Sequence, residues 1–150
     1  MRVYNEDILR AAGDPSLLTR HEDGSQHIDV EKFFSENLAY PPGHFDAILA
    51  WAVADYLPEE LVRPLIERAQ RILKPHGALL ALFHTKDAGA DSPYCRYHIV
   101  QPDVLELEPD PGFRIQRIFN NRHIETLFQD FASRKFFLGR DNIREVVVVR

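Results

Sequence analysis

Two nearly continuous apolar runs, Phe45–Trp51 and residues 78–83, constrain the fold of this chain more than any other feature. Each has the length of a strand, and an unbroken apolar run is typical of a central strand that is covered on both faces. The stretch between them opens with Pro58 and two acidic residues, which is typical of a helix start. Apolar residues then recur on one helical face, at Leu61, Leu65, Ala69 and Ile72. Residues 74–77 end this helix, so the pattern predicts a right-handed parallel strand–helix–strand crossover.

The sequence before residue 45 is more polar. Residues 2–4 are a candidate short strand, and residues 13–26, with two glycines and a proline, are predicted to be loop. Asp29 is a candidate N-cap, because apolar residues at helical spacing follow it. These are Val30, Phe33, Phe34 and Leu38. The Pro-Pro-Gly run at residues 41–43 ends this helix.

The segment after the second apolar run is less regular. Residues 85–112 contain four prolines, and we expect only short extended pieces in them, around residues 97–100 and 104–107. Residues 113–119 are a candidate strand.

The C-terminal part again has clear periodicity. A helix capped by Asn120 or Asn121 carries apolar residues on one face. These are Ile124, Leu127, Phe128 and Phe131. Residues 135–138 and 143–149 are predicted strands with a short joint between them, so we expect an antiparallel hairpin.

Composition limits the classes of function. The 150 residues fit one domain, 1–150, with an insert at about 85–120. A net charge of -5 without a Lys/Arg cluster predicts no nucleic-acid partner. The single cysteine excludes an internal disulfide, and the seven histidines have no paired helical spacing, so we expect no metal. No apolar stretch is long enough to span a membrane, and we expect a cytoplasmic protein without a membrane partner.

The nine residues 72–80, Ile-Leu-Lys-Pro-His-Gly-Ala-Leu-Leu, are similar to the "LKPGG" turn that enters the fifth strand of class I S-adenosylmethionine-dependent methyltransferases, with His76 in place of the first glycine. The order of elements around this turn also resembles the C-terminal two-thirds of that family's domain. The resemblance implies an α/β fold, namely a truncated Rossmann-like three-layer sandwich of parallel strands with a C-terminal antiparallel hairpin. It also implies S-adenosylmethionine as the cofactor and a small molecule as the methyl acceptor.

The family's glycine-rich cofactor loop has no counterpart in this sequence. None of the seven glycines is spaced as GxG. Because this loop lets backbone N–H groups approach the ligand closely, we expect the chain alone to bind S-adenosylmethionine weakly or not at all and to be inactive by itself. In the family, the strand that corresponds to Phe45–Trp51 pairs with a first strand, which is absent here. An unpaired apolar edge invites pairing with another chain, so we expect a homo-oligomer, most simply a dimer.

Five residues are candidate contacts of the cofactor by resemblance to the family. They are Asp7, Ile8, Ala50, Trp51 and Ala52. Asp7 and Ile8 would lie near the adenine, and the other three would lie near the methionine part, where Trp51 would pack on the sulfonium. The alternatives are that Asp7 caps a helix and that Trp51 is a core residue.

Three residues are candidates for chemistry, because they follow the two central strands at their carboxyl ends, where ligands of such folds bind. Asp55 and Tyr56 would orient a substrate or take its proton, and His84 is the best candidate general base. The alternatives are a helix cap for Asp55 and a merely hydrogen-bonded histidine for His84. The insert contains Tyr94, Arg96, Tyr97, His98 and Arg117. In the family such inserts often cover the substrate.

These observations favour a methyltransferase-family protein that acts on a small molecule. The alternative is a methyltransferase-like module that catalyses nothing and associates with itself or a partner. An α/β-hydrolase is a poor third hypothesis, because the sequence has no GxSxG motif.

Overall fold

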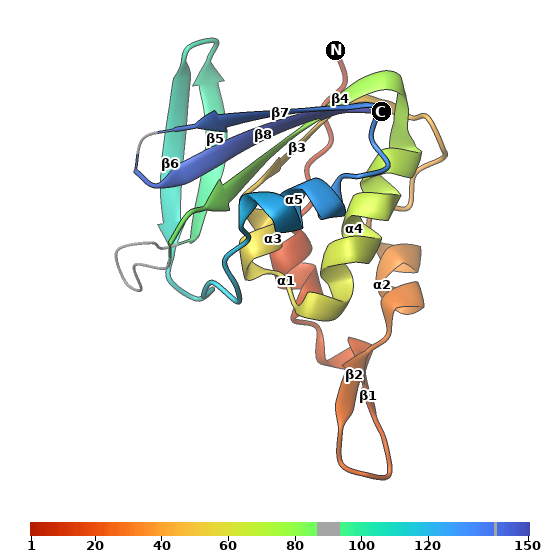
Figure 1. Cartoon of the computed structure of the whole chain (residues 1–150). Coiled ribbons are helices and arrows are strands. Elements are labelled where there is room, and N and C mark those ends of the chain that lie inside the picture. Colours follow the sequence, from red (N-terminus) through yellow and green to blue (C-terminus); the bar gives the residue numbers. More distant parts are fainter. Residues whose placement is uncertain (87–93, 140) are drawn as a thin grey trace.

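The computed structural model describes residues 1–86, 94–139 and 141–150 (Figure 1). Its helices are Ile8–Ala12 (α1), Val30–Glu36 (α2), Val53–Tyr56 (α3), Glu59–Ile72 (α4) and Asn121–Leu127 (α5), with a 3-10 turn at Pro15–Leu17 (η1). Its strands are Leu18–Arg20 (β1), Gln26–Ile28 (β2), Phe45–Trp51 (β3), Leu73–His84 (β4), Tyr94–Gln101 (β5), Val104–Asp110 (β6), Ser133–Leu138 (β7) and Ile143–Val149 (β8).

A mixed sheet of four strands, in the order β3-β4-β8-β7, forms the centre of the molecule. β3 and β4 are parallel, with Leu49 opposite Leu80. β8 runs antiparallel to β4 and also to β7. The predicted parallel crossover and the C-terminal hairpin are therefore confirmed, and the chain has the expected α/β Rossmann-like fold class. This topology brings the carboxyl ends of β3 and β4 to the same edge of the sheet.

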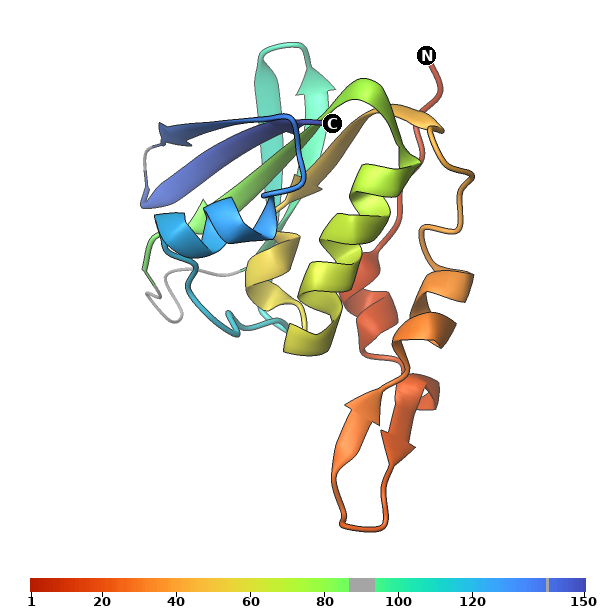
Figure 2. The ribbon, with the colours of Figure 1, turned by 45° about the vertical axis from the view of Figure 1, so that its right-hand side comes forward.

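Helices α4 and α5 lie on one side of this sheet (Figures 1 and 2). A buried cluster joins Ala69 of α4, Leu79 of β4 and Phe128, which follows α5. Ile72, Leu79 and Phe128 lie on the apolar faces of their predicted elements, which predicts that all three are core residues. They are at most 1% exposed, so the prediction is confirmed. Full burial of an apolar side chain of this size contributes about 1.5–3 kcal/mol. Such packing explains why α4 forms although Pro64 lies inside it.

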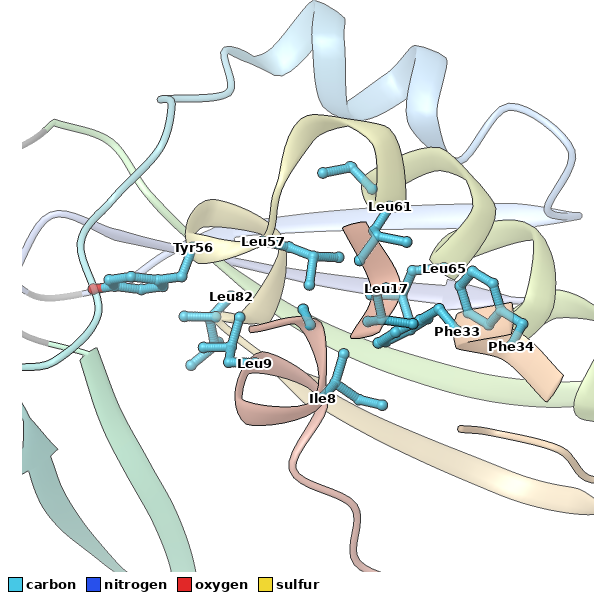
Figure 3. Packing of buried hydrophobic residues seen from close by; sticks show 13 residues of the cluster. Ile8, Leu9, Leu17, Phe33, Phe34, Tyr56, Leu57, Leu61, Leu65 and Leu82 are labelled. Carbon is cyan, nitrogen blue, oxygen red and sulfur yellow. The ribbon is translucent and has the colours of Figure 1, made fainter. Parts of the chain in front are cut away.

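A second buried cluster joins the N-terminal region to α4 (Figure 3). Figure 3 shows Leu61 and Leu65 of α4 directed toward Leu17 and Phe33. As predicted, Asp29 caps α2, and its side chain accepts a hydrogen bond from the backbone N–H of Lys32 at 3.0 Å.

Two predictions for the N-terminal region are wrong. Residues 2–4 form no strand, and residues 13–26, predicted to be loop, contain η1 and the hairpin β1–β2. The hairpin pairs Thr19 with His27, and every residue of β1 is exposed. Strands that bury neither face have no alternation of apolar and polar residues, so the pattern that identifies strands was missing.

The insert contains a long antiparallel hairpin, β5–β6, which includes both predicted extended pieces. The predicted strand at residues 113–119 is wrong. This segment crosses α3, where the backbone N–H of Gln116 donates to the carbonyl of Asp55 at 2.8 Å. The guanidinium of Arg117 donates to the carbonyls of Ala54, at 2.7 Å, and Leu57. Here hydrogen bonds to carbonyl groups of the α3 region take the place of a strand ladder.

Residues 74–77, predicted to be a turn after the helix, form the first part of β4, which begins directly after α4. The pairing of β4 with β3 is irregular there, between Leu73 and Ala78. His76 has a φ of 68°, in the left-handed region that favours glycine. A Cβ on Gly77 would lie 2.8 Å from the carbonyl oxygen of Lys74 and 3.1 Å from that of Asp46. The close approach of the two main chains therefore requires glycine at position 77.

Candidate functional site

Asp55 and His84, predicted separately from the ends of two strands, are in direct contact. Asp55 lies in α3, four residues after the end of β3, and His84 is the last residue of β4. Asp55 Oδ2 accepts a hydrogen bond from the backbone N–H of His84 at 2.7 Å and lies 2.8 Å from His84 Nδ1. The parallel pairing of β3 and β4 brings the two residues together, because both strands end at the same edge of the sheet.

Both members of this pair are buried. Asp55 is fully buried and His84 is 8% exposed. Burial raises the pKa of Asp55, while the hydrogen bonds from His84 and the charges of His84 and Arg117 oppose this effect. The second oxygen, Oδ1, has no hydrogen-bond partner among the described residues. Asp55 is not a helix cap: α3 is preceded by Ala52, and no side chain caps it.

The contact defines the role that each ring nitrogen of His84 can take. An ionised carboxylate only accepts hydrogen bonds, so Nδ1 is the donor to Asp55 and a neutral ring has its lone pair on Nε2. If Nε2 then takes a proton, the imidazolium lies beside the Asp55 carboxylate, which stabilises it. The arrangement is that of a general base held and oriented by a carboxylate.

Aromatic rings surround the pair. The ring of Tyr56, the third candidate, meets the His84 ring edge-on at 5.8 Å between centroids, and Tyr94 meets Tyr56 at 5.1 Å. In Figure 3 the hydroxyl of Tyr56 points away from the buried cluster. Burial raises the pKa of Tyr97 to about 12, and it also raises the pKa of Tyr94. These two phenols stay protonated at neutral pH, so His84 is the better proton acceptor.

The candidate cofactor residues are engaged in contacts within the chain. Asp7 caps α1 by accepting from the backbone N–H of Arg10, as in the alternative interpretation, and Ile8 is 8% exposed in the core. Ala52 is buried and Ala50 is half-buried. Trp51 is half-buried, and its ring is stacked on Tyr97 at 4.7 Å. Each of these residues is thus buried or in contact within the chain, and its role in cofactor binding stays a prediction.

Ion pairs connect the β5–β6 hairpin to the N-terminal segment. Arg96 of β5 lies 3.2 Å from the carboxylates of both Asp7 and Asp110. These side chains are about one-third exposed, so each pair contributes less than about 1 kcal/mol. The sequence indicated that Arg96 belongs to an insert near the site. It did not indicate the partner Asp7, because the two residues are distant in the chain and their pairing depends on the hairpin.

A shallow surface depression of about 450 Å³ lies elsewhere, between α2 and α4, and is lined by residues such as Phe34, Glu67 and Arg68. It is distant from the buried pair, and its lining includes none of the predicted site residues. Among residues 1–86, 94–139 and 141–150, no cluster of His, Cys, Asp and Glu is suited to a metal ion. In the same part of the chain, no helix is long and apolar enough to cross a membrane.

Comparison with known proteins gives one family match. The model of a family described as "Methyltransferase domain" matches residues 9–81, a segment that contains β3, α4 and residues 74–77. No curated protein matches the chain.

Several solved structures are similar to the chain. One is a "possible exported protein" from Bordetella parapertussis, with 19% identity, 73% of this chain and 40% of that chain covered, and a TM-score of 0.49. Another is 1,6-didemethyltoxoflavin-N1-methyltransferase from Burkholderia thailandensis, with 11% identity and a TM-score of 0.48. The match covers 74% of this chain and 46% of that chain. A third is an O-methyltransferase family protein from the same organism, with 16% identity and a TM-score of 0.48. The match covers 77% of this chain and 32% of that chain. The chain thus spans less than half the length of each of these three proteins.

Proposed function

We propose that the chain is a methyltransferase-family protein that acts in the methylation of a small molecule and that His84 takes the proton of the methyl acceptor, since the model of the methyltransferase domain family matches residues 9–81. The observation that carries this proposal is the buried contact of 2.8 Å between Asp55 Oδ2 and His84 Nδ1 at the carboxyl ends of two parallel strands. Ligands of such folds bind at that edge.

In this class of reaction S-adenosylmethionine supplies the methyl group. An acceptor hydroxyl, thiol or protonated amine loses its proton when it is methylated. His84 Nε2 accepts that proton, and the positive charge that develops on the ring is stabilised by Asp55. Proton transfer by a positioned side chain contributes typically about 10²- to 10⁴-fold to a rate.

A non-catalytic module is the second candidate function. The observation that favours it is the engagement of the candidate cofactor residues, with Trp51 stacked on Tyr97 and Asp7 paired with Arg96. A chain that retains these contacts would keep the fold but would not hold the cofactor.

The experiment measures S-adenosylhomocysteine release at millimolar S-adenosylmethionine with catechol, a small thiol and a small amine as acceptors. The chain alone is expected to bind the cofactor weakly, so the proposal requires acceptor-dependent release only at this high concentration of S-adenosylmethionine. That release should fall at least about 100-fold in His84→Gln and should also fall in Asp55→Asn. His123→Gln, which replaces an exposed histidine of α5, is the matched control and should retain wild-type activity. No acceptor-dependent release, or equal release from His84→Gln and wild type, would favour the non-catalytic module.

A further inference from the structure

One face of the central sheet is covered only in part among the described residues. Leu82 of β4 belongs to the buried cluster that contains Ile8 and Leu9 of α1, whereas Ala47, Leu49, Val147 and Val149 lie in neither buried cluster. Leu79 and Val146 lie in the cluster under α4 and α5, so their neighbours along the strands point to the opposite side. The register places Leu49, Leu80 and Val147 in one row on that side. Leu80 packs against the cluster that contains α1, so we call the surface formed by Ala47, Leu49, Val147 and Val149 the open face. Leu49 is 47% exposed.

The open face ends at an unpaired strand edge. Among the described residues β3 pairs only with β4. Residues 1–6 are exposed, and no main-chain hydrogen bond joins them to β3. Asp46 is the single charged residue of β3, and it forms an ion pair with Lys74 at 3.0 Å. Tyr4 packs edge-on against Phe45 at the start of β3, with 5.4 Å between the ring centroids. Along the rest of β3 the usual devices that block an edge, namely charge, proline or a covering segment, are nearly absent among the described residues.

The β5–β6 hairpin extends the apolar surface. In both Figure 1 and Figure 2 its turn rises above the sheet, on the side opposite to α4 and α5. Ile99 lies opposite Leu105, and Tyr97 lies opposite Leu107, so these side chains share one hairpin face. Tyr97 stacks on Trp51 of β3. Beyond this stack, Ile99, Leu105 and Leu107 are 61%, 43% and 49% exposed.

The exposed area is large for a single folded chain. A compact monomer of 17.4 kDa exposes about 7,900 Å². This chain exposes 9708 Å², roughly 1,800 Å² more than that expectation. The projecting hairpins contribute to this excess, but it is more than twice the area of about 800 Å² that each partner buries in a standard interface.

We infer that two copies of this chain associate through the open face, the β3 edge and the apolar face of the β5–β6 hairpin, related by a two-fold axis. The β3 edge suits a second copy. If the edges pair antiparallel about an axis at Ile48, each Asp46 lies opposite Ala50 of the other copy, so no like charges meet. Two-fold pairing is also the commonest closed arrangement of identical chains. This inference does not rest on the proposed catalytic role of His84.

Sedimentation and light scattering at micromolar concentrations test the inference on three variants and the wild type. Leu49→Lys places a charge on the open face, and Leu107→Lys places one on the hairpin. Leu138→Lys is the matched control, because Leu138 is an exposed leucine of β7 at the other end of the strand order. We expect the wild type and Leu138→Lys to have about twice the mass of one 17.4 kDa chain. We expect the two test variants to dissociate at concentrations at least tenfold higher than the wild type does.

Circular dichroism shows whether each variant folds. If Leu49→Lys does not fold, the mass of Leu107→Lys alone tests the dimer interface. A wild-type mass of one chain that persists at high concentration would overturn the inference. So would dimers that neither test variant weakens, dissociation of the control to the same degree, or masses that keep growing with concentration, which indicate open-ended pairing.

Discussion

The segment of residues 74–77 gives the sharpest test of the fold. His76 has a φ of 68°, and the left-handed conformation costs a residue with a side chain about 1–2 kcal/mol. Glycine removes this cost but loses about 0.5–1 kcal/mol more conformational entropy on folding. The side chain of His76 is exposed, so little packing is lost on its removal. We therefore expect His76→Gly to raise the free energy of unfolding by about 0.5–1 kcal/mol.

The neighbouring position supplies the opposite test. Both oxygens that would meet a Cβ on Gly77 belong to the main chain, at 2.8 and 3.1 Å, so neither can rotate away. Overpacking of this kind costs typically about 1–3 kcal/mol, and Gly77→Ala should lower the free energy of unfolding accordingly. Urea unfolding followed by the fluorescence of Trp51, the single tryptophan, measures both changes. A destabilised His76→Gly, or a Gly77→Ala within about 0.5 kcal/mol of wild type, would refute this account of the segment.

Three further predictions concern the core, the cofactor and pH. Leu79→Ala should lower the free energy of unfolding by about 2–5 kcal/mol in urea titrations, and a loss below about 0.5 kcal/mol would mean that the core assignment is wrong. Because the chain has no GxG spacing and Trp51 is stacked on Tyr97, calorimetry should give a dissociation constant for S-adenosylmethionine above about 10 µM, and a tighter constant would contradict this. Burial raises the pKa of Asp55, so its contribution to stability is complete below about pH 3.9 and is lost as the pH rises through the folded-state pKa. The stability of wild type relative to Asp55→Asn should therefore fall as the pH rises above about 4 in urea titrations, and a rise would exclude this explanation.

The sequence predicted those parts of the fold that depend on local pattern and burial. The apolar run Phe45–Trp51 predicted β3, and the cap at Asn120 was confirmed by its hydrogen bond from the backbone N–H of His123 at 2.8 Å. The parts that it did not predict depend on distant partners. Residues 113–119 have the composition of a strand, but their polar groups bind the carbonyls of α3 and its neighbours.

For the site, the rule that ligands bind at the carboxyl ends of parallel strands selected Asp55, Tyr56 and His84. The structure brings these three residues together, and their catalytic role stays a prediction. The burial of Asp55 was not predictable, because it depends on the insert folding back over α3. The ion pair between Arg96 and Asp7 also depends on that insert.

Trp51 connects the fold to the candidate site. This residue has a φ of 47°, a conformation that costs a bulky side chain about 1–3 kcal/mol and that persists only where its surroundings impose it. Two surroundings do so: the stack on Tyr97, and α3, which begins at Val53 with only Ala52 between. With no loop after β3, Asp55 lies close enough to the end of β4 to reach His84. The strain at Trp51 is thus the local cost of placing a buried carboxylate beside the histidine. Trp51 is thus both a candidate cofactor contact and part of the local structure that positions Asp55, so activity and affinity for S-adenosylmethionine must be measured separately on this chain.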